Sequence, residues 1–160
     1  MHLESKRIEF PRFFFLSNDD LITILAETRD PLLVQPHMKK CFEGINELLF
    51  NSSSDIIGMK SGEKEEINFL ERIIVKNYKS NVEKWLLKVE EQMVCSIAKI
   101  TEDSFMDIQA NPEKKAEWTK NWPGQIVLAN NQLIWTEKVE TKFLEKKPGG
   151  LNHLFKEMEG

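Results

Sequence analysis

The chain has 160 residues, of which 41% are apolar and 30% charged, and its formal net charge is −4 with no basic block. This balance is typical of a folded chain of one-domain size, excludes a disordered chain, and makes a nucleic-acid partner unexpected. No apolar run approaches the roughly 20 residues that span a bilayer and no signal peptide is evident, so we expect a soluble intracellular protein without membrane contact.

The first 50 residues predict two helices. Phe13–Phe15 suit a short buried extended run, and Ser17 or Asn18 then caps a helix that ends at Asp30-Pro31. A second helix is predicted from apolar residues that recur at steps of three and four, namely Met38, Cys41, Phe42, Ile45, Leu48 and Leu49.

A change of period at about residues 55–70 predicts a β-hairpin. Ile57 and Met59 alternate with polar neighbours, as do Ile67 and Phe69, on either side of a turn at Ser61-Gly62. One side of this hairpin is expected to pack against the core.

Two long helices are predicted in the second half of the chain. The first, at about residues 81–108, carries apolar residues at helical spacing, among them Trp85, Leu86 and Val89. Asn111-Pro112 then starts a shorter helix, and Trp122-Pro123-Gly124 breaks the chain before a second long helix at about 123–145. That helix is expected to present Ile126, Ala129, Leu133, Val139 and Phe143 along one side. A short terminal helix follows at 151–158.

No catalytic, cofactor or metal site is predicted. The stretch GMKSGEK, Gly58 to Lys64, lacks the glycine spacing of a phosphate-binding loop, and a hairpin turn explains it equally well. His37 and Cys41 are four residues apart but have no further metal ligand nearby, and Cys41 and Cys95 are expected to be reduced thiols. The four tryptophans are expected in the core: Trp85, Trp118, Trp122 and Trp135.

Three segments, in this order, closely resemble the linker region of dynein heavy chains: FPRFFFLSNDDLITILAETRDPLLVQPHMKKCFEGI, NVEKWLLKVEEQM and EWTKNWPGQIVLANNQLIWTEKVE. The resemblance runs from about Phe10 to about Val139, and VQPH, KCFE and WPGQ are more similar to the axonemal members than to the cytoplasmic ones. It implies that residues 1–160 are a single fragment of the linker. The fold expected is mainly α, an elongated bundle of packed helices with an inserted antiparallel β-hairpin.

The resemblance also implies a mechanical function. The linker of this family lies across a ring of AAA+ modules, bends when the ring hydrolyses ATP, and straightens in the power stroke. The fragment is therefore expected to be non-catalytic and to hold no cofactor, because ATP and Mg²⁺ bind in modules further along the parent chain. Its expected partners are the ring of the same heavy chain and other dynein subunits, with microtubules reached only through parts absent here. The expected location is the cytoplasm and cytoskeleton, in the axoneme of a cilium or flagellum.

Two candidate sites follow from this reading. Trp122, Pro123, Gly124 and Trp135 are predicted to form a corner between stiff helices, which either bends or is an ordinary rigid turn. The hairpin tip is predicted to contact the ring through Ser61, Gly62, Glu63 and Lys64. The alternative functions are a free-standing helical scaffold that binds another protein and, less favoured by the residues, a small helical enzyme.

Overall fold

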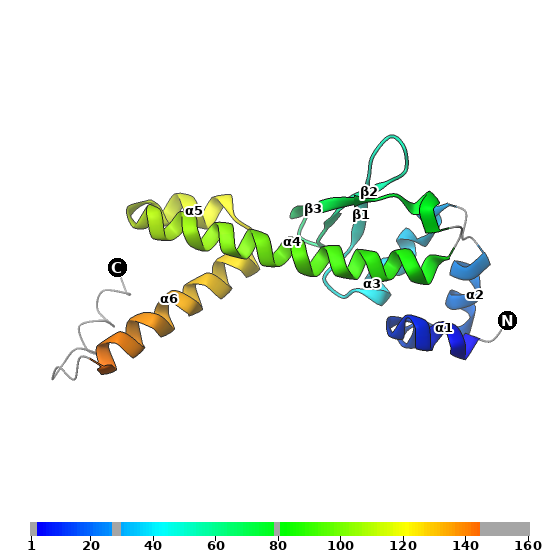
Figure 1. The fold of residues 1–160 in the computed structure, drawn as a ribbon, viewed down its shortest axis with the longest axis horizontal. Coiled ribbons are helices and arrows are strands. Elements are labelled where there is room, and N and C mark those ends of the chain that lie inside the picture. The colour runs from blue at the N-terminus through cyan, green and yellow to red at the C-terminus, as the bar shows by residue number, and fades with distance from the viewer. Residues whose placement is uncertain (1–2, 27–29, 79–80, 145–160) are drawn as a thin grey trace. The chain divides into compact units, whose positions relative to one another are not determined.

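The computed structural model describes residues 3–26, 30–78 and 81–144 (Figure 1). The chain divides into two compact units, residues 1–98 and 99–160, and one helix, α4 (Val82–Ala110), supplies residues to both. The sequence pattern did not indicate this division. The helix predicted at 151–158 lies outside the described residues.

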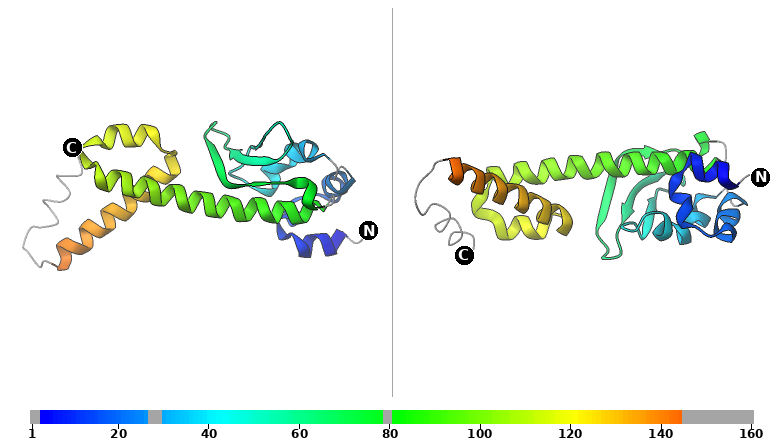
Figure 2. Two further views of the ribbon diagram at one scale, coloured as in Figure 1. Left: turned by 45° about the horizontal axis from the view of Figure 1, so that its top comes forward. Right: turned by 90° about the horizontal axis from the view of Figure 1, so that it is seen from below.

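The first unit combines short helices with a small sheet. Its helices are α1 (Leu3–Glu9), η1 (Pro11–Phe15), α2 (Asn18–Ala26), η2 (Pro31–Val34), α3 (Gln35–Cys41) and η3 (Val75–Tyr78), where η marks a 3-10 helix. The strands β1 (Glu47–Phe50), β2 (Ile56–Lys60) and β3 (Glu66–Ile73) form an antiparallel sheet in the order β1-β2-β3. Figure 2 shows these strands side by side, with the first half of α4 running along β3.

The described part of the second unit contains helices and no strand. It contains the end of α4, then η4 (Pro112–Lys114), α5 (Lys115–Asn121) and α6 (Gly124–Leu144). Helix α4 thus occupies the region predicted at 81–108, and α6 that predicted at 123–145, of which residue 145 is not described. The predicted class, mainly α with an inserted antiparallel hairpin, is confirmed.

The prediction of one helix through residues 38–49 is wrong in its second half. Helix α3 ends at Cys41, because Phe42 is extended and Gly44 lies in the turn that follows, and Glu47–Phe50 form strand β1. Phe42, Ile45 and Leu48 are nevertheless buried. A spacing of three and four residues over so short a run fits a helix, but it also fits a loop and strand that cover the same core.

The expected extended run at Phe13–Phe15 is also wrong. Pro11 starts a 3-10 turn, because its fixed φ suits the first position of a helix, and Phe13 N–H donates to Phe10 O at 3.0 Å. Only Phe13 of the three is buried, whereas Phe14 and Phe15 are 65% and 72% exposed. A 3-10 turn directs successive side chains to different sides, so three consecutive phenylalanines do not share one buried face.

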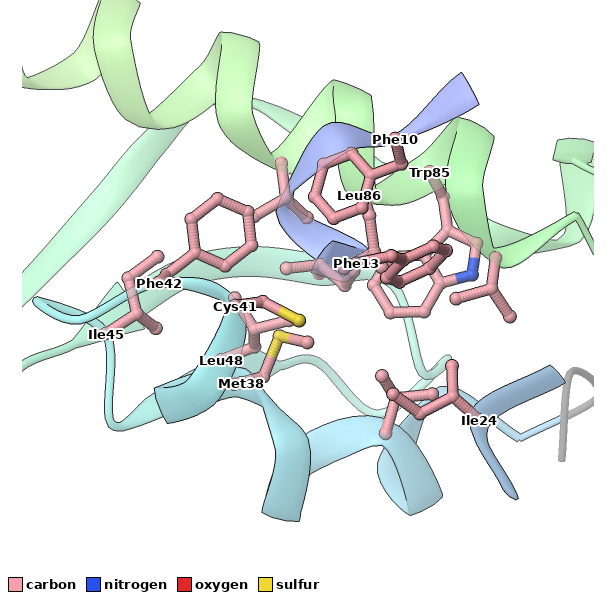
Figure 3. Packing of buried hydrophobic residues seen from close by; sticks show 14 of the residues in the cluster. Phe10, Phe13, Ile24, Met38, Cys41, Phe42, Ile45, Leu48, Trp85 and Leu86 are labelled. Carbon is pink, nitrogen blue, oxygen red and sulfur yellow. The ribbon is translucent and has the colours of Figure 1, made fainter. Parts of the chain in front are cut away.

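The core of the first unit is formed where the N-terminal segment, α3 and α4 meet (Figure 3). Phe10 and Phe13 pack edge to face with ring centroids 4.9 Å apart, and Trp85 and Leu86 approach them from α4. Met38 and Cys41 close this core from α3, and both are at most 2% exposed. The first turns of α4 are therefore the element around which the unit is packed.

Two ion pairs attach the N-terminal segment to α4. Lys6 Nζ bonds to Glu83, whose side chain is 3% exposed, and Arg12 Nη2 lies 2.9 Å from Glu90 Oε1. Arg12 also donates from Nη1 to Cys41 O at 3.2 Å, and its guanidinium lies 4.8 Å from the centre of the Phe42 ring. Both partners on α4 lie more than 70 residues along the chain from Lys6 and Arg12, so local sequence carries no sign of these contacts.

Gly58 lies in the middle of β2, where β3 approaches closely. An ideal Cβ placed on Gly58 would lie 2.5 Å from Ile67 O, so no larger residue fits without displacing β3. The packing of two strands thus explains Gly58, the first glycine of the GMKSGEK stretch.

Candidate functional site

The predicted corner is a break between α5 and α6 in the second unit. Trp122 is extended, with φ −115° and ψ 150°, as expected for the residue before a proline. Pro123 O accepts hydrogen bonds from the N–H groups of Ile126 and Val127, each at 3.0 Å, and these bonds open α6. The proline therefore ends one helical segment and begins the next.

Helix α4 holds this corner through four hydrogen bonds donated by three side chains, here called the α4 ladder. Trp118 Nε1 donates to Ser104 O at 2.9 Å and to Ser104 Oγ at 3.0 Å. Trp122 Nε1 donates to Asp107 Oδ2 at 2.9 Å, and Asn130 Nδ2 donates to Thr101 O at 3.1 Å. The accepting residues Thr101, Ser104 and Asp107 are three apart, so they lie on one face of α4.

A small apolar cluster lies beside the ladder. Ile108, Trp118 and Val127 are 6%, 2% and 5% exposed, and the half-buried Trp122 and Ile134 pack against them. The cluster joins α4, α5 and α6, so packing and hydrogen bonding fix the corner together.

Trp135 is not part of this cluster, and its expected burial at the corner is wrong. Its side chain is 39% exposed, because the inward face of α6 runs through Val127, Asn130 and Ile134 at steps of three and four. Trp135 follows Ile134 directly and is therefore rotated by about 100° away from that face. Leu133 and Phe143, predicted to lie along one side of this helix with Ile126, are exposed, whereas Ile126 is buried.

Described residues of the second unit line a pocket and a groove. A pocket of about 200 Å³ is lined by Asp107, Asn111, Lys114, Glu117, Trp118 and Asn121. The Asp107 carboxylate in this pocket already accepts from Trp122 and, at 3.3 Å, from Asn111 Nδ2. A second groove, of about 270 Å³, has apolar and charged walls formed by Ile108, Gln109, Pro112, Lys115, Asn131, Ile134, Glu137 and Lys138.

The hairpin tip is a well-defined turn. Ser61 Oγ accepts from the N–H groups of Glu63 and Glu65, each at 3.2 Å, and Lys64 N–H donates to Ser61 O at 3.1 Å. Lys64 has φ 70°, a left-handed conformation that few residues other than glycine adopt. Gly62, Glu63 and Lys64 are exposed and Ser61 is half-buried, so the tip presents one negative and one positive side chain to solvent.

His37 and Cys41 both belong to α3. Burial raises the pKa of the Cys41 thiol to about 11, which disfavours the thiolate that would bind a metal. His37 Nδ1 lies 3.5 Å from Asp20 Oδ1, and Lys40 Nζ lies 2.7 Å from Asp20 Oδ2. The bonds from Lys40 and Ser17 lower the pKa of Asp20. Within the described residues no group of three or more His, Cys, Asp or Glu could hold a metal, and no helix is long and apolar enough to cross a membrane.

Sequence reasoning found Trp118 as a core residue but missed the polar residues of the α4 ladder. Ser104 and Asn130 are fully buried, and Asp107 bonds to a tryptophan 15 residues further along the chain. The available signal was the recurrence of Thr101, Ser104 and Asp107 at helical spacing, opposite a segment rich in tryptophan.

Comparison with known proteins gives relatives over nearly the whole chain. Residues 1–104 match the family described as dynein heavy chain, N-terminal region 2. Dynein axonemal heavy chain 3 of Homo sapiens is 45% identical over 147 residues, which are 90% of this chain and 3% of that protein. Dynein axonemal heavy chain 12 of Mus musculus is 43% identical over 159 residues, 99% of this chain and 5% of the relative. Dynein axonemal heavy chain 1 of Mus musculus is 48% identical over 139 residues, which are 86% of this chain and 3% of that protein. The chain spans only a few per cent of the length of these relatives.

Proposed function

We propose, from the premise that this chain belongs to the dynein heavy chain family, that it is a mechanical linker segment of an axonemal-type heavy chain. The family match over residues 1–104 and identities of 43 to 48% to axonemal heavy chains support this proposal. The segment transmits the ATP-driven conformational change of the AAA+ ring and so takes part in the power stroke. It is non-catalytic by itself, and ATP and Mg²⁺ act in other modules of the parent motor, in the axoneme.

The main support for the mechanical role is the set of contacts between the corner and α4. Helix α4 is continuous over 29 residues, or about 40 Å at 1.5 Å per residue. The α4 ladder and the Ile108–Trp118–Val127 cluster attach the break at Pro123 to the end of this helix. Close-packed helices of this kind resist bending within themselves, so a load is passed to their ends.

Binding to the ring tests this function directly. The 160-residue chain is titrated against the ring of a related heavy chain lacking its own linker, with ATP, with ADP and without nucleotide. We expect affinities that differ between nucleotide states by about 5-fold or more, because a coupled element must bind the states unequally. We expect no ATP turnover by the chain alone. Equal affinity in all states, or turnover that survives purification, contradicts the proposal.

The hairpin tip is tested in the same titration. The double variant Glu63→Lys, Lys64→Glu exchanges the two tip charges and is expected to weaken binding in the state that binds most tightly, because charge complementarity at the contact is lost. Glu137→Lys, Lys138→Glu is the matched control, since these residues are also an adjacent, exposed Glu-Lys pair. Unchanged binding by the tip variant removes the tip from the proposed interface.

A second variant tests the corner. In Pro123→Ala, Gly124→Ala, alanine permits α5 and α6 to join as one helix, because the helix breaker and the most flexible residue are both removed. We expect a longer mean distance between fluorophores at Glu117 and Glu140, and slower gliding by a motor that carries the change. Leu128→Ala, at an exposed position of α6, serves as the control. If both the distance and the stability are unchanged, Pro123 and Gly124 do not set the angle between α5 and α6.

One observation favours the alternative, a free-standing scaffold that binds another protein. Leu128, Leu133 and Phe143 on α6 are 55% to 63% exposed, more apolar surface than one helix of a self-sufficient domain usually shows. Tight binding of a partner at this face without any ring would support that function.

A further inference from the structure

Helix α6 is attached to the rest of the second unit mainly through its first turns. Its buried residues are Ile126, Val127 and Asn130, all within the first two turns of the helix. Ile134, which continues this face four residues after Asn130, is half-buried, and Lys138, one turn further, is exposed. The remainder of α6 therefore adds little to the attachment.

A polar residue occupies the middle of this attachment, which we call the α6 seat. The seat consists of Val127, Asn130 and Ile134 on α6 with Thr101 and Ile108 on α4. Asn130 is 0% exposed, and its Nδ2 donates to Thr101 O at 3.1 Å. Val127 and Ile134, about one turn before and after it, pack in the apolar cluster of Ile108. The middle of the seat thus has one directional hydrogen bond where an aliphatic residue would extend the apolar contact.

The other polar atom of this amide is unpaired. Asn130 Oδ1 is buried and has no hydrogen-bond partner within residues 3–26, 30–78 and 81–144. Burying an amide oxygen without a partner costs free energy, because its bonds to water are lost. Exchanging the oxygen and nitrogen of the amide would direct Oδ1 at Thr101 O, which is also an acceptor, so the observed orientation is the better of the two. Asn130 therefore weakens the seat that it occupies.

Leucine has nearly the shape of asparagine and would leave no new polar group unpaired at this position. The Thr101 carbonyl lies inside α4, where it also accepts the N–H of Phe105, as in any α-helix. Removing the Asn130 amide therefore takes away only a second bond, and it also removes the desolvation cost of the unpaired oxygen. Leucine would add apolar contact beside Val127 and Ile134. The asparagine thus attaches α6 to α4 less strongly than leucine would.

We propose that Asn130 makes α6 a releasable helix. Its bond to Thr101 O sets where α6 lies on α4, and its unpaired oxygen keeps the free energy of release small. Helix α6 then leaves and rejoins α4 while α4 stays folded, since Trp85 and Leu86 hold the first turns of α4 in the core of the first unit. This inference rests on the proposed mechanical function, in which the segment changes between states of the ring.

The first test is hydrogen exchange of the 160-residue chain alone. In Asn130→Leu, we expect the amides of residues 128–134 to exchange at least about 10-fold more slowly than in wild type, because release of α6 becomes less favourable. The amides of the sheet, which belongs to the first unit, should exchange as in wild type.

Two further variants control this test. Asn131→Leu is the matched control, since it makes the same substitution at the next residue of α6, which is half-buried and outside the seat. The higher helix propensity of leucine should slow exchange in this control by only about 2-fold. Should Asn130→Leu lose its fold in circular dichroism, the smaller Asn130→Val replaces it, because valine and asparagine have similar helix propensities.

The second test repeats the titration against the ring with Asn130→Leu. If one nucleotide state of the ring binds the chain with α6 released, the affinity in that state falls by the factor by which exchange slows. We therefore expect binding to weaken by about 10-fold in one state and to stay unchanged in the others. Equal affinities of the wild-type chain in all states contradict the proposed function, whereas the exchange of the chain alone still decides the role of Asn130.

Three results would overturn the proposal. Unchanged or faster exchange in Asn130→Leu and Asn130→Val would show that the bond to Thr101 O outweighs the unpaired oxygen. Equal slowing in Asn131→Leu would show that helix propensity explains the effect. Slower exchange in Asn130→Leu with unchanged affinities in every nucleotide state would show that α6 stays on α4 when the segment binds the ring.

Discussion

Replacing Trp118 by alanine is expected to unfold the second unit while the first unit remains folded. The indole is 2% exposed and is one of three buried members of its apolar cluster, the others being Ile108 and Val127. Deleting a buried tryptophan costs about 3–5 kcal/mol, and a cluster this small cannot close around the cavity. Ser104 Oγ and the Ser104 carbonyl also lose the N–H that they share.

The measurement is hydrogen exchange read separately for the two units, together with urea unfolding. We expect loss of protection in α5 and α6 and retained protection in the sheet. Trp135→Ala is the matched control, because this tryptophan also lies in the second unit but is 39% exposed and outside the cluster. Its cost should stay below about 1 kcal/mol. Equal effects of the two substitutions would show that the cluster does not hold the unit together.

Replacing Lys6 by methionine is expected to destabilise the first unit by about 2–3 kcal/mol, because the buried Glu83 side chain, 3% exposed, then loses its cationic partner. This value lies below that of a fully buried pair because Lys6 is 24% exposed, so water screens part of the interaction. The free energy of unfolding of the first unit, from hydrogen exchange of the sheet amides at increasing urea concentration, measures the change.

The pH dependence of the same pair has a defined sign. The hydrogen bond that Lys6 donates to Glu83 raises the pKa of Lys6 above its usual value of 10.5. The stabilisation is therefore fully present below pH 10.5 and is lost as the pH rises through the higher pKa of the folded state. Wild type and Lys6→Met should converge in that alkaline range.

Two controls separate this ion pair from a general effect of lysine removal. Lys99→Met breaks an exposed pair with Glu102 and Asp103 and should leave the free energy of unfolding nearly unchanged. The double variant Lys6→Met, Glu83→Met should recover most of the loss, because no unpaired buried charge remains. A double variant as unstable as Lys6→Met would mean that packing of α1, and not the ion pair, is responsible.

Local sequence determined much of the secondary structure and the family. The spacing of Trp85, Leu86 and Val89 predicts a helix whose buried face the structure shows in α4. Pro123 predicts where α6 begins, because a missing N–H and a fixed φ act on the nearest residues. Long ordered motifs identified the dynein heavy chains, and the family match confirms that resemblance.

Only the tertiary structure decided which polar groups meet. Lys6 and Glu83 are 77 residues apart, Gln92 meets β3, and Asp107 meets Trp122. Periodicity also misplaced Leu48 in a helix and Trp135 in the core. Side-chain spacing reports a repeat along one segment, whereas a hydrogen bond or a buried face depends on what another segment brings to it. The sequence by itself therefore determined the two long helices, the chain break at Pro123 and the family of this chain, and the packing of distant segments decided the bonds from α4 to β3, the ion pairs and the contacts that hold the corner.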